Sequence, residues 1–170
     1  MSHDAADEEF EVGPKPTAPR PGLSLKARAV GLLSRREHSR AELQRKLAPH
    51  AETQEALDKV LDELAKAGWQ SDARFTQGWV HRKAPAHGAA RIVQDLRLQG
   101  IPAEAIAVVQ SELKESELSR AQAVWSRKFS RIGNPSSPAE YAKQGRFLAS
   151  RGFSTDIIRR VLKNPGLEDD

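Results

Sequence analysis

From Leu23 onward, apolar residues recur every three or four positions, which is the spacing of one face of an α-helix. Glycine, proline and helix-capping residues interrupt this pattern at intervals. No stretch alternates apolar and polar residues for long enough to predict a β-strand. The pattern therefore predicts nine helices. The first ends near residue 36 and the second spans about 40–48, and the third, fifth and eighth stop at the glycines at 68, 100 and 152. The fourth is capped at 71, the sixth and seventh begin at 102 and 116, and the ninth ends at 164–166.

Two capping signals mark helix starts. Ser39 and Glu42 have the S-x-x-E spacing of a capping box, in which serine accepts from a helix amide and glutamate reaches back to the serine amide. Ser137 and Glu140 repeat this spacing, with a proline at the first helical position. Pro102 is predicted to occupy the same position in its helix. The first box predicts a tight corner between two helices.

An internal repeat underlies these helices. A shift of 49 residues places Leu43, Leu47, Leu57 and Val60 on Ile92, Leu96, Ile106 and Val109. A further shift of 52 residues places Leu96, Gly100, Ile106 and Val109 on Leu148, Gly152, Ile158 and Val161. Ile92 falls on Gln144, so the third copy is the weakest.

The repeat predicts an all-α fold of three tandem three-helix units, resembling helix-turn-helix modules, in an elongated, curved array. The expected divisions are a Pro-rich acidic leader at 1–22, repeats at 23–68, 69–115 and 116–164, and an acidic tail at 165–170. The leader is expected to be disordered because its prolines and acids leave little surface to bury.

Composition limits the classes of protein. The chain has 170 residues, about one domain, and no cysteine, so disulfides and thiolate metal sites are excluded. It has no apolar run approaching the roughly 18 residues of a membrane span and no secretory signal at its acidic N-terminus. We therefore expect a cytoplasmic protein that makes no contact with membranes.

The charge is unevenly distributed. Residues 1–22 and the last three residues each carry a net charge of −3, whereas the whole chain carries +4, so residues 23–167 carry +10. A basic body points to an acidic partner, either nucleic acid or a protein that carries it. Ordinary solubility is the alternative explanation.

No residue pattern predicts catalysis. The histidines at 3, 38, 50, 81 and 87 lack metal-ligand spacing, and no glycine-rich loop with a lysine is present to hold phosphate. The carboxylates near residue 60 lie mostly on a solvated helix face, which argues against an acid/base pair. We expect a non-enzymatic protein without cofactor or metal.

Four aromatic residues are expected in the core: Trp79, Trp125, Phe75 and Phe129. Trp69 either covers the core or faces a partner.

The most informative polar residues are cations near the three corners between helices. We take ten as candidate partner-binding residues: Arg35, Arg36, Arg40, Arg82, Lys83, Arg91, Arg97, Arg127, Lys128 and Arg131. Attraction to a helix C-terminus, about 0.3–1 kcal/mol per cation, explains one cation per helix more easily than two or three. If the units stack, the clusters are expected to form a basic strip along one side.

Several stretches resemble the RecX regulatory proteins of bacteria: RREHSRAEL at 35–43, SDARF at 71–75, HGAARIVQDLRLQGI at 87–101 and, more weakly, FLASRGFSTDIIRRVL at 147–162. The similarity covers about residues 25–163. The family's motif positions present here include Arg35, Arg36, Ser39, Glu42, Leu43, Asp72, Phe75, Gly88, Leu96 and Gly100. The chain departs from the usual pattern at 48–51, where Ala-Pro-His-Ala replaces a glycine-containing turn.

The resemblance implies a monomeric, non-enzymatic modulator that acts in DNA repair, recombination and the SOS response. Its expected partner is the RecA recombinase filament on single-stranded DNA. Occupying the filament groove would mainly inhibit the ATPase, coprotease and strand-exchange activities, with weak direct DNA contact at most. The alternatives are non-specific DNA binding without a recombinase target, and a scaffold module that does not meet nucleic acid.

Overall fold

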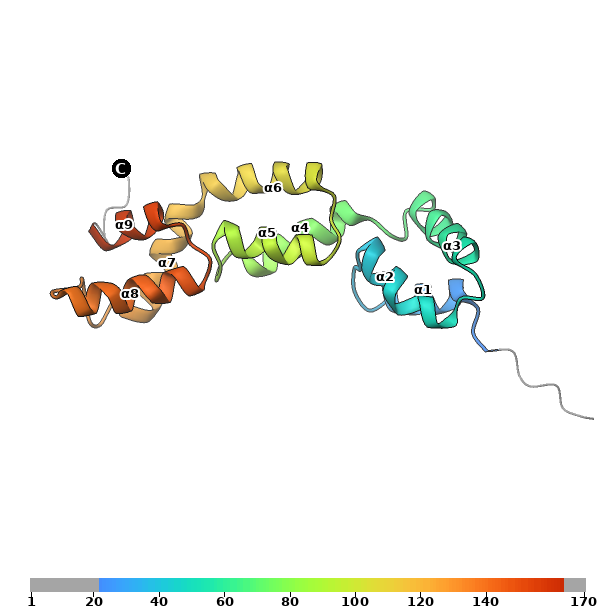
Figure 1. Cartoon of the computed structure of the whole chain (residues 1–170), viewed down its shortest axis with the longest axis horizontal. Helices are drawn as coiled ribbons and strands as arrows, with labels where there is room; N and C mark the ends of the chain where they lie inside the picture. Colours follow the sequence, from blue (N-terminus) through green and yellow to red (C-terminus); the bar gives the residue numbers. More distant parts are fainter. Residues whose placement is uncertain (1–21, 164–170) are drawn as a thin grey trace, which may run out of the picture.

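The computed structural model describes residues 22–163, which form nine α-helices, one short 3-10 turn and no β-strand. Figure 1 shows three helical units in a row along an elongated, gently arched body. Unit 1 contains α1 (Leu25–Leu33), α2 (Arg40–Leu47) and α3 (Gln54–Lys66). Unit 2 contains α4 (Asp72–Lys83), α5 (Ala89–Leu98) and α6 (Ala103–Glu115). Unit 3 contains α7 (Glu117–Phe129), α8 (Pro138–Ser150) and α9 (Thr155–Lys163). The predicted all-α class and tandem three-helix organisation are confirmed. The acidic tail and the leader, apart from Gly22, lie outside the described residues.

Short polar side chains begin many of these helices. Before α1, α2, α3, α4 and α8, a Ser or Thr oxygen accepts a hydrogen bond from the amide three residues on. Each cap of this kind contributes about 1 kcal/mol. Pro49 lies in the 3-10 turn Ala48–His50, which follows α2 directly.

Three details of the predicted helix starts are wrong. Pro102 precedes α6 as its N-cap and is not the first helical residue. Ser39 accepts from the Glu42 amide as expected, but the Glu42 carboxylate contacts Arg36 and His38 and does not close the box. The Glu140 carboxylate likewise accepts from the amide and hydroxyl of Ser136, one residue before the cap. A stronger cationic donor is within reach of Glu42, whereas Ser136 offers Glu140 two donors.

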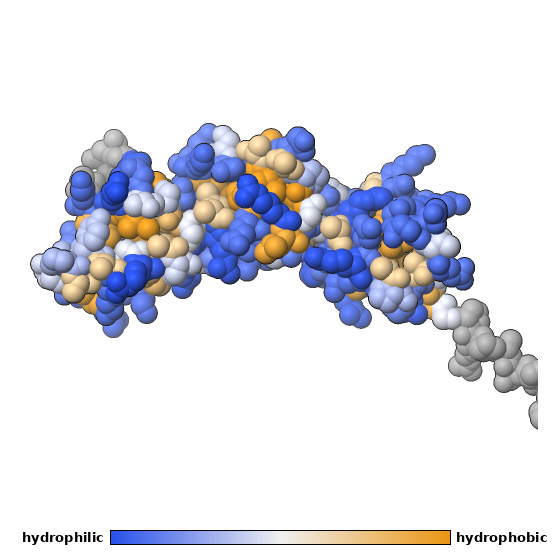
Figure 2. All heavy atoms as spheres, in the orientation of Figure 1, coloured by the Kyte–Doolittle hydropathy of each residue, from blue (hydrophilic) through white to orange (hydrophobic). Residues whose placement is uncertain are grey.

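Each unit has its own core. The repeat predicted from the sequence supplies equivalent positions in all three, for example Leu47, Leu96 and Leu148, each at most 1% exposed. Full burial of one such side chain is worth about 1.5–3 kcal/mol. The aromatic residues expected in the core are buried, except that Trp79 is half-buried at the core's edge. Figure 2 shows hydrophilic residues over all three units on the viewed face.

The weak point of the third copy has a structural reason. Gln144 occupies the position of Leu43 and Ile92 and is only 2% exposed. Its side-chain oxygen accepts from the Trp125 indole (2.7 Å), and its side-chain nitrogen donates to the Gly133 carbonyl (3.2 Å). A buried amide is tolerated when its groups are paired in this way.

A similar pair of hydrogen bonds joins unit 1 to unit 2 and unit 2 to unit 3. At the first junction, the Ser39 hydroxyl donates to the Gln99 carbonyl (2.7 Å), and the Arg40 amide donates to Asp72 (2.8 Å). Both donors belong to the start of α2, and Asp72 is the first residue of α4. A carboxylate from the next unit therefore accepts from an amide at the N-terminus of α2, where negative charge is favoured.

The second junction repeats this arrangement with different residues. The Gly88 amide at the start of α5 donates to the Arg151 carbonyl (2.8 Å), and the Ala89 amide donates to Glu117 (3.1 Å), the first residue of α7. Gly152 follows with φ +84°, and a Cβ there would lie 2.5 Å from the Arg91 Cβ. Gly100, with φ +73°, makes the equivalent approach to Ala41. Direct backbone packing therefore sets the orientation of each unit against the next.

Candidate basic surface

The first corner places its three predicted cations in different environments. Arg36 donates through two nitrogens to the two oxygens of the Glu42 carboxylate. Arg40 pairs with Asp62 on α3 (2.7 Å). Arg35 is exposed, and no ion pair holds it within residues 22–163. Of this corner, Arg35 is therefore the cation most available to an external anion.

Glu42 explains why Arg36 is part of the fold. Burial of its carboxyl favours the neutral form, but the hydrogen bond from Arg36 and the charges of Arg36 and His38 outweigh this effect. The net result is a pKa of Glu42 below its ordinary value. The His38 Nδ1 lies 2.9 Å from Glu42 Oε2, and the His38 side chain is almost fully buried. Reversing the charge of Arg36 would break a partly buried ion pair as well as remove a surface cation.

The second corner holds its cations over an aromatic ring. Arg82 and Lys83 lie in the last turn of α4, 5.8 Å and 5.4 Å from the centre of the Trp79 ring. A cation over tryptophan is attracted to the face of the ring. This contact positions both side chains at the end of α4.

The third corner meets the second at the junction of units 2 and 3. Arg127 donates from the last turn of α7 to the Pro85 carbonyl, in the turn that follows Lys83. Arg127 and Lys128, together with Arg151 from the α8 C-cap, line a pocket of about 290 Å³ beside Ala86 and Phe147. The structure thus places Arg127 of the third corner against the turn of the second corner, whereas Arg35 belongs to the corner between α1 and α2 of unit 1.

The remaining candidates are on exposed positions. Arg91 lies 3.6 Å from Asp95 one turn along α5. Arg97, Lys128 and Arg131 are exposed, and the described part of the chain offers none of them an ion pair. Arg131 lies just beyond the end of α7, at Phe129, and not within the helix.

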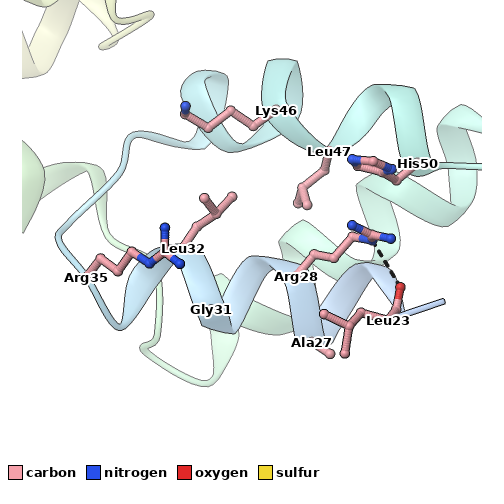
Figure 3. A pocket seen from close by; sticks show the side chains of 9 residues that line it. All are labelled: Leu23, Ala27, Arg28, Gly31, Leu32, Arg35, Lys46, Leu47 and His50. Carbon is pink, nitrogen blue, oxygen red and sulfur yellow. Dashed lines mark hydrogen bonds between the residues drawn. The ribbon is translucent and has the colours of Figure 1, made fainter.

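Sequence reasoning missed a cation-rich pocket on unit 1. Arg28, Arg35, Lys46 and His50 surround a cavity of about 340 Å³, which is floored by apolar side chains and has no carboxylate among its nine lining residues. Figure 3 shows α1 and α2 on opposite sides, with Leu32 and Leu47 between them. The sequence carried only a weak signal, because Arg35 lies beyond the end of α1 and His50 lies in the turn after α2, so that helical spacing does not relate them to Arg28 and Lys46.

Sequence reasoning also missed arginines that hold units together. Arg120 on α7 donates to the carbonyls of Ala84 (3.2 Å), His87 (2.5 Å) and Leu113 (2.7 Å). Burial lowers the pKa of Arg120, and the charge of Glu117 opposes this shift. Arg74 makes a similar set of bonds at the first junction, to Glu37 and to two connector carbonyls. No feature of the sequence distinguishes these arginines from the surface ones.

The sequence did not decide whether Trp69 covers the core or faces a partner. In the structure, Trp69 is 53% exposed in the connector between units 1 and 2.

In residues 22–163 there is no group of His, Cys, Asp or Glu side chains that could hold a metal ion. No helix in that range has the length and apolarity needed to cross a membrane. The features that remain are the charged corners and the two cation-lined pockets.

The fold and this surface define a class: a tandem three-helix repeat protein with cationic corners between its helices. Models of the first, second and third three-helix domains of RecX match residues 26–64, 71–109 and 115–162. The chain therefore belongs to the RecX family of regulatory proteins, as the sequence resemblance predicted.

Similar proteins support this assignment. A regulatory protein RecX from Ralstonia nicotianae is 49% identical over 145 residues, which cover 85% of this chain and 90% of that relative. One from Leptothrix cholodnii is 48% identical over 152 residues, covering 89% and 95%. The crystal structure of RecX from Lactobacillus salivarius has a TM-score of 0.72 at 17% identity, covering 83% of this chain and 94% of that one. At that identity, the structural match shows the fold alone.

Proposed function

We propose that this protein binds the RecA filament on single-stranded DNA and inhibits its ATPase, coprotease and strand-exchange activities. The relatives are named regulatory proteins. This name favours a role in which the protein controls another protein and does not itself catalyse a reaction. On this proposal the chain acts as a monomer in the cytoplasm and needs no cofactor.

The observation that carries the proposal is the repeated junction between units. At both junctions, a residue at the start of one helix donates to a backbone carbonyl just before a closely packed glycine, at 39–41 with 99–100 and at 88–91 with 151–152. The corners therefore recur along the row in a fixed arrangement. A nucleoprotein filament is also a repeating polymer, and it carries phosphate near its groove. Several modest contacts made by one rigid body add up through effective concentration.

The cations that form no ion pair within residues 22–163 provide the sharpest test. Arg35, Arg97, Lys128 and Arg131 are exposed and come from all three units, so replacing all four with glutamate should leave the cores intact. We expect weaker inhibition of the RecA ATPase on single-stranded DNA. If each cation contacts a phosphate, the salt dependence should fall by a slope of about 3.

A matched control reverses four lysines elsewhere: Lys59, Lys66, Lys114 and Lys143, which are all exposed. The change in net charge is the same, so non-specific repulsion is equal in the two variants. Equal loss of inhibition in both would show that net charge matters and the corners do not. Full inhibition by the corner variant at unchanged stability would contradict the proposal.

Direct binding to DNA without a recombinase is the second candidate, because helix–corner–helix units with basic residues are compatible with it. The cations are spread over several helices and not gathered on one recognition helix, which favours weak, non-specific contact. Titration against bare single-stranded DNA, RecA alone and the assembled filament separates the two. Tight binding to the filament alone supports the proposal, and equal binding to bare DNA supports the alternative.

A further inference from the structure

The pocket on unit 1 has a chemistry that the proposed function does not use. Its rim carries Arg28, Arg35, Lys46 and His50, and its walls include Leu32 and Leu47. Ala27 and Gly31 line the α1 side, where their small side chains leave room for a ligand. At about 340 Å³ it lies at the lower end of the range for small-ligand sites. The pocket is suited to a segment that combines negative charge with one apolar side chain.

The chain itself contains such a segment. Asp4, Asp7, Glu8, Glu9 and Glu11 surround Phe10, and no base occurs between residues 4 and 11. These residues precede Gly22, where the described chain begins, and Leu23 lines the pocket. The acidic segment is therefore joined to the edge of a pocket of opposite charge.

We propose that residues 4–11 bind in this pocket, with the acids beside the cationic rim and Phe10 against Leu32 and Leu47. Eleven residues lie between Phe10 and Gly22, a span of at most about 40 Å, whereas α1 along the pocket is only about 14 Å long. The segment can thus fold back onto the pocket. A short connection gives an effective concentration of millimolar order, so even a weak, millimolar contact fills the pocket about half of the time.

Docking of the segment would cover Arg35, one of the cations assigned to the filament. This regulatory consequence rests on the proposed function, whereas the docking itself does not. The leader would then compete with the filament's phosphate groups for the same cation. Removing the leader's acids should make the protein inhibit RecA at about half the concentration.

The absence of cysteine allows a direct test on the protein alone. A nitroxide attached at S2C should broaden the amide signals of Ala27, Gly31 and Lys46 in NMR spectra of the full chain. A second version replaces the five acids with Asn and Gln at the same label position. We expect about twofold less broadening at the three amides in this version, and the same loss in the native sequence at 0.5 M salt.

Variants of the pocket supply the second arm of the test. K46E with H50E should reduce the broadening, whereas K59E with K66E on α3 should leave it unchanged, because those lysines lie on another helix with mixed charge. If the pocket variant does not fold, the neutral leader, which alters no described residue, still decides the question.

Equal broadening by the native and neutral leaders would overturn the proposal. So would pocket signals that shift with a short single-stranded oligonucleotide and show no response to the leader, since nucleic acid would then be the occupant. These measurements contain no RecA. Failure here therefore leaves the proposed function standing, and failure of the inhibition assays leaves the docking standing.

Discussion

Replacing Gly88 with alanine should open the junction between units 2 and 3. A Cβ at this position would lie 2.2 Å from the Gly152 carbonyl oxygen and 2.5 Å from the Phe153 amide nitrogen. Both atoms belong to the backbone, so no side-chain rotation relieves the clash. The φ of Gly88 is −76°, which alanine adopts readily, and the effect therefore comes from the contact and not from backbone strain.

The size of the effect follows from these distances. Carbon and carbonyl oxygen approach to about 3.3 Å, so the two backbones must separate by about 1 Å. That movement stretches the 2.8 Å bond from the Gly88 amide to the Arg151 carbonyl beyond hydrogen-bonding distance. It also weakens the bond from the Ala89 amide to the Glu117 carboxylate. Losing one neutral and one charged hydrogen bond lowers the free energy of unfolding by about 2–4 kcal/mol.

Urea unfolding followed by circular dichroism measures this change, and small-angle X-ray scattering measures the shape of the folded protein. G31A is the control, because it is another Gly-to-Ala change, within α1, whose added Cβ meets nothing within 4 Å. G31A should stabilise the protein by about 0.5–1 kcal/mol through helix propensity. If G88A unfolds at the native urea concentration with an unchanged scattering profile, the junction is soft and the reasoning fails.

Three further outcomes follow from other contacts. S39A removes both the α2 cap and the bond to the Gln99 carbonyl, so it should lower the free energy of unfolding in urea by about 2–3 kcal/mol. S137A removes only an exposed cap and should lower it by about 1 kcal/mol; equal losses would refute the role of Ser39 at the junction. Q144L restores the apolar residue of the other units but leaves the Trp125 indole without its partner, and should destabilise by about 1–3 kcal/mol; a gain in stability would contradict this. Because the pKa of Glu42 is lowered in the fold, its contribution is present above the unfolded pKa and is lost as pH falls through the folded pKa; E42Q should flatten the acid limb of a stability–pH curve, and an unchanged curve would count against the pairing.

The helices and their grouping could be predicted because both depend on local sequence. Apolar spacing, caps and glycine stops act within a few residues of one another, and a repeat reveals itself by a simple shift. Leu47, Leu96 and Leu148 were assigned to equivalent positions in this way, and all are buried in equivalent cores. The ends of helices were less certain: α1 ends at Leu33, earlier than predicted, because Arg35 and Arg36 belong to the corner.

The polar contacts were not predictable because they join residues far apart in the chain. The capping-box spacing assigned Glu42 to Ser39, but spacing cannot show that Arg36 and His38 approach the same carboxylate. Asp72 and Glu117 each lie in the first turn of a helix and also accept from an amide of the preceding unit, which no pattern in the sequence indicated. Their function depends on the stacking of the units, which the sequence pattern does not define.

The corners combine two roles that mutations must keep apart. Arg36 and Arg40 lie beside junction residues and pair with carboxylates of their own unit. Because the Glu42 carboxylate is largely buried, reversing the charge of Arg36 changes the fold as well as the surface, whereas the pair of Arg40 with Asp62 is exposed. The cost of exposing an unpaired carboxylate at a partly buried site is larger than the value of one screened surface contact. Loss of RecA inhibition after reversing Arg36 would thus report on the junction first. On the proposed function, a polyanion that follows the row would instead depend on cations that form no ion pair within residues 22–163, such as Arg35 and Arg97, and their removal is expected to alter binding while the junctions persist.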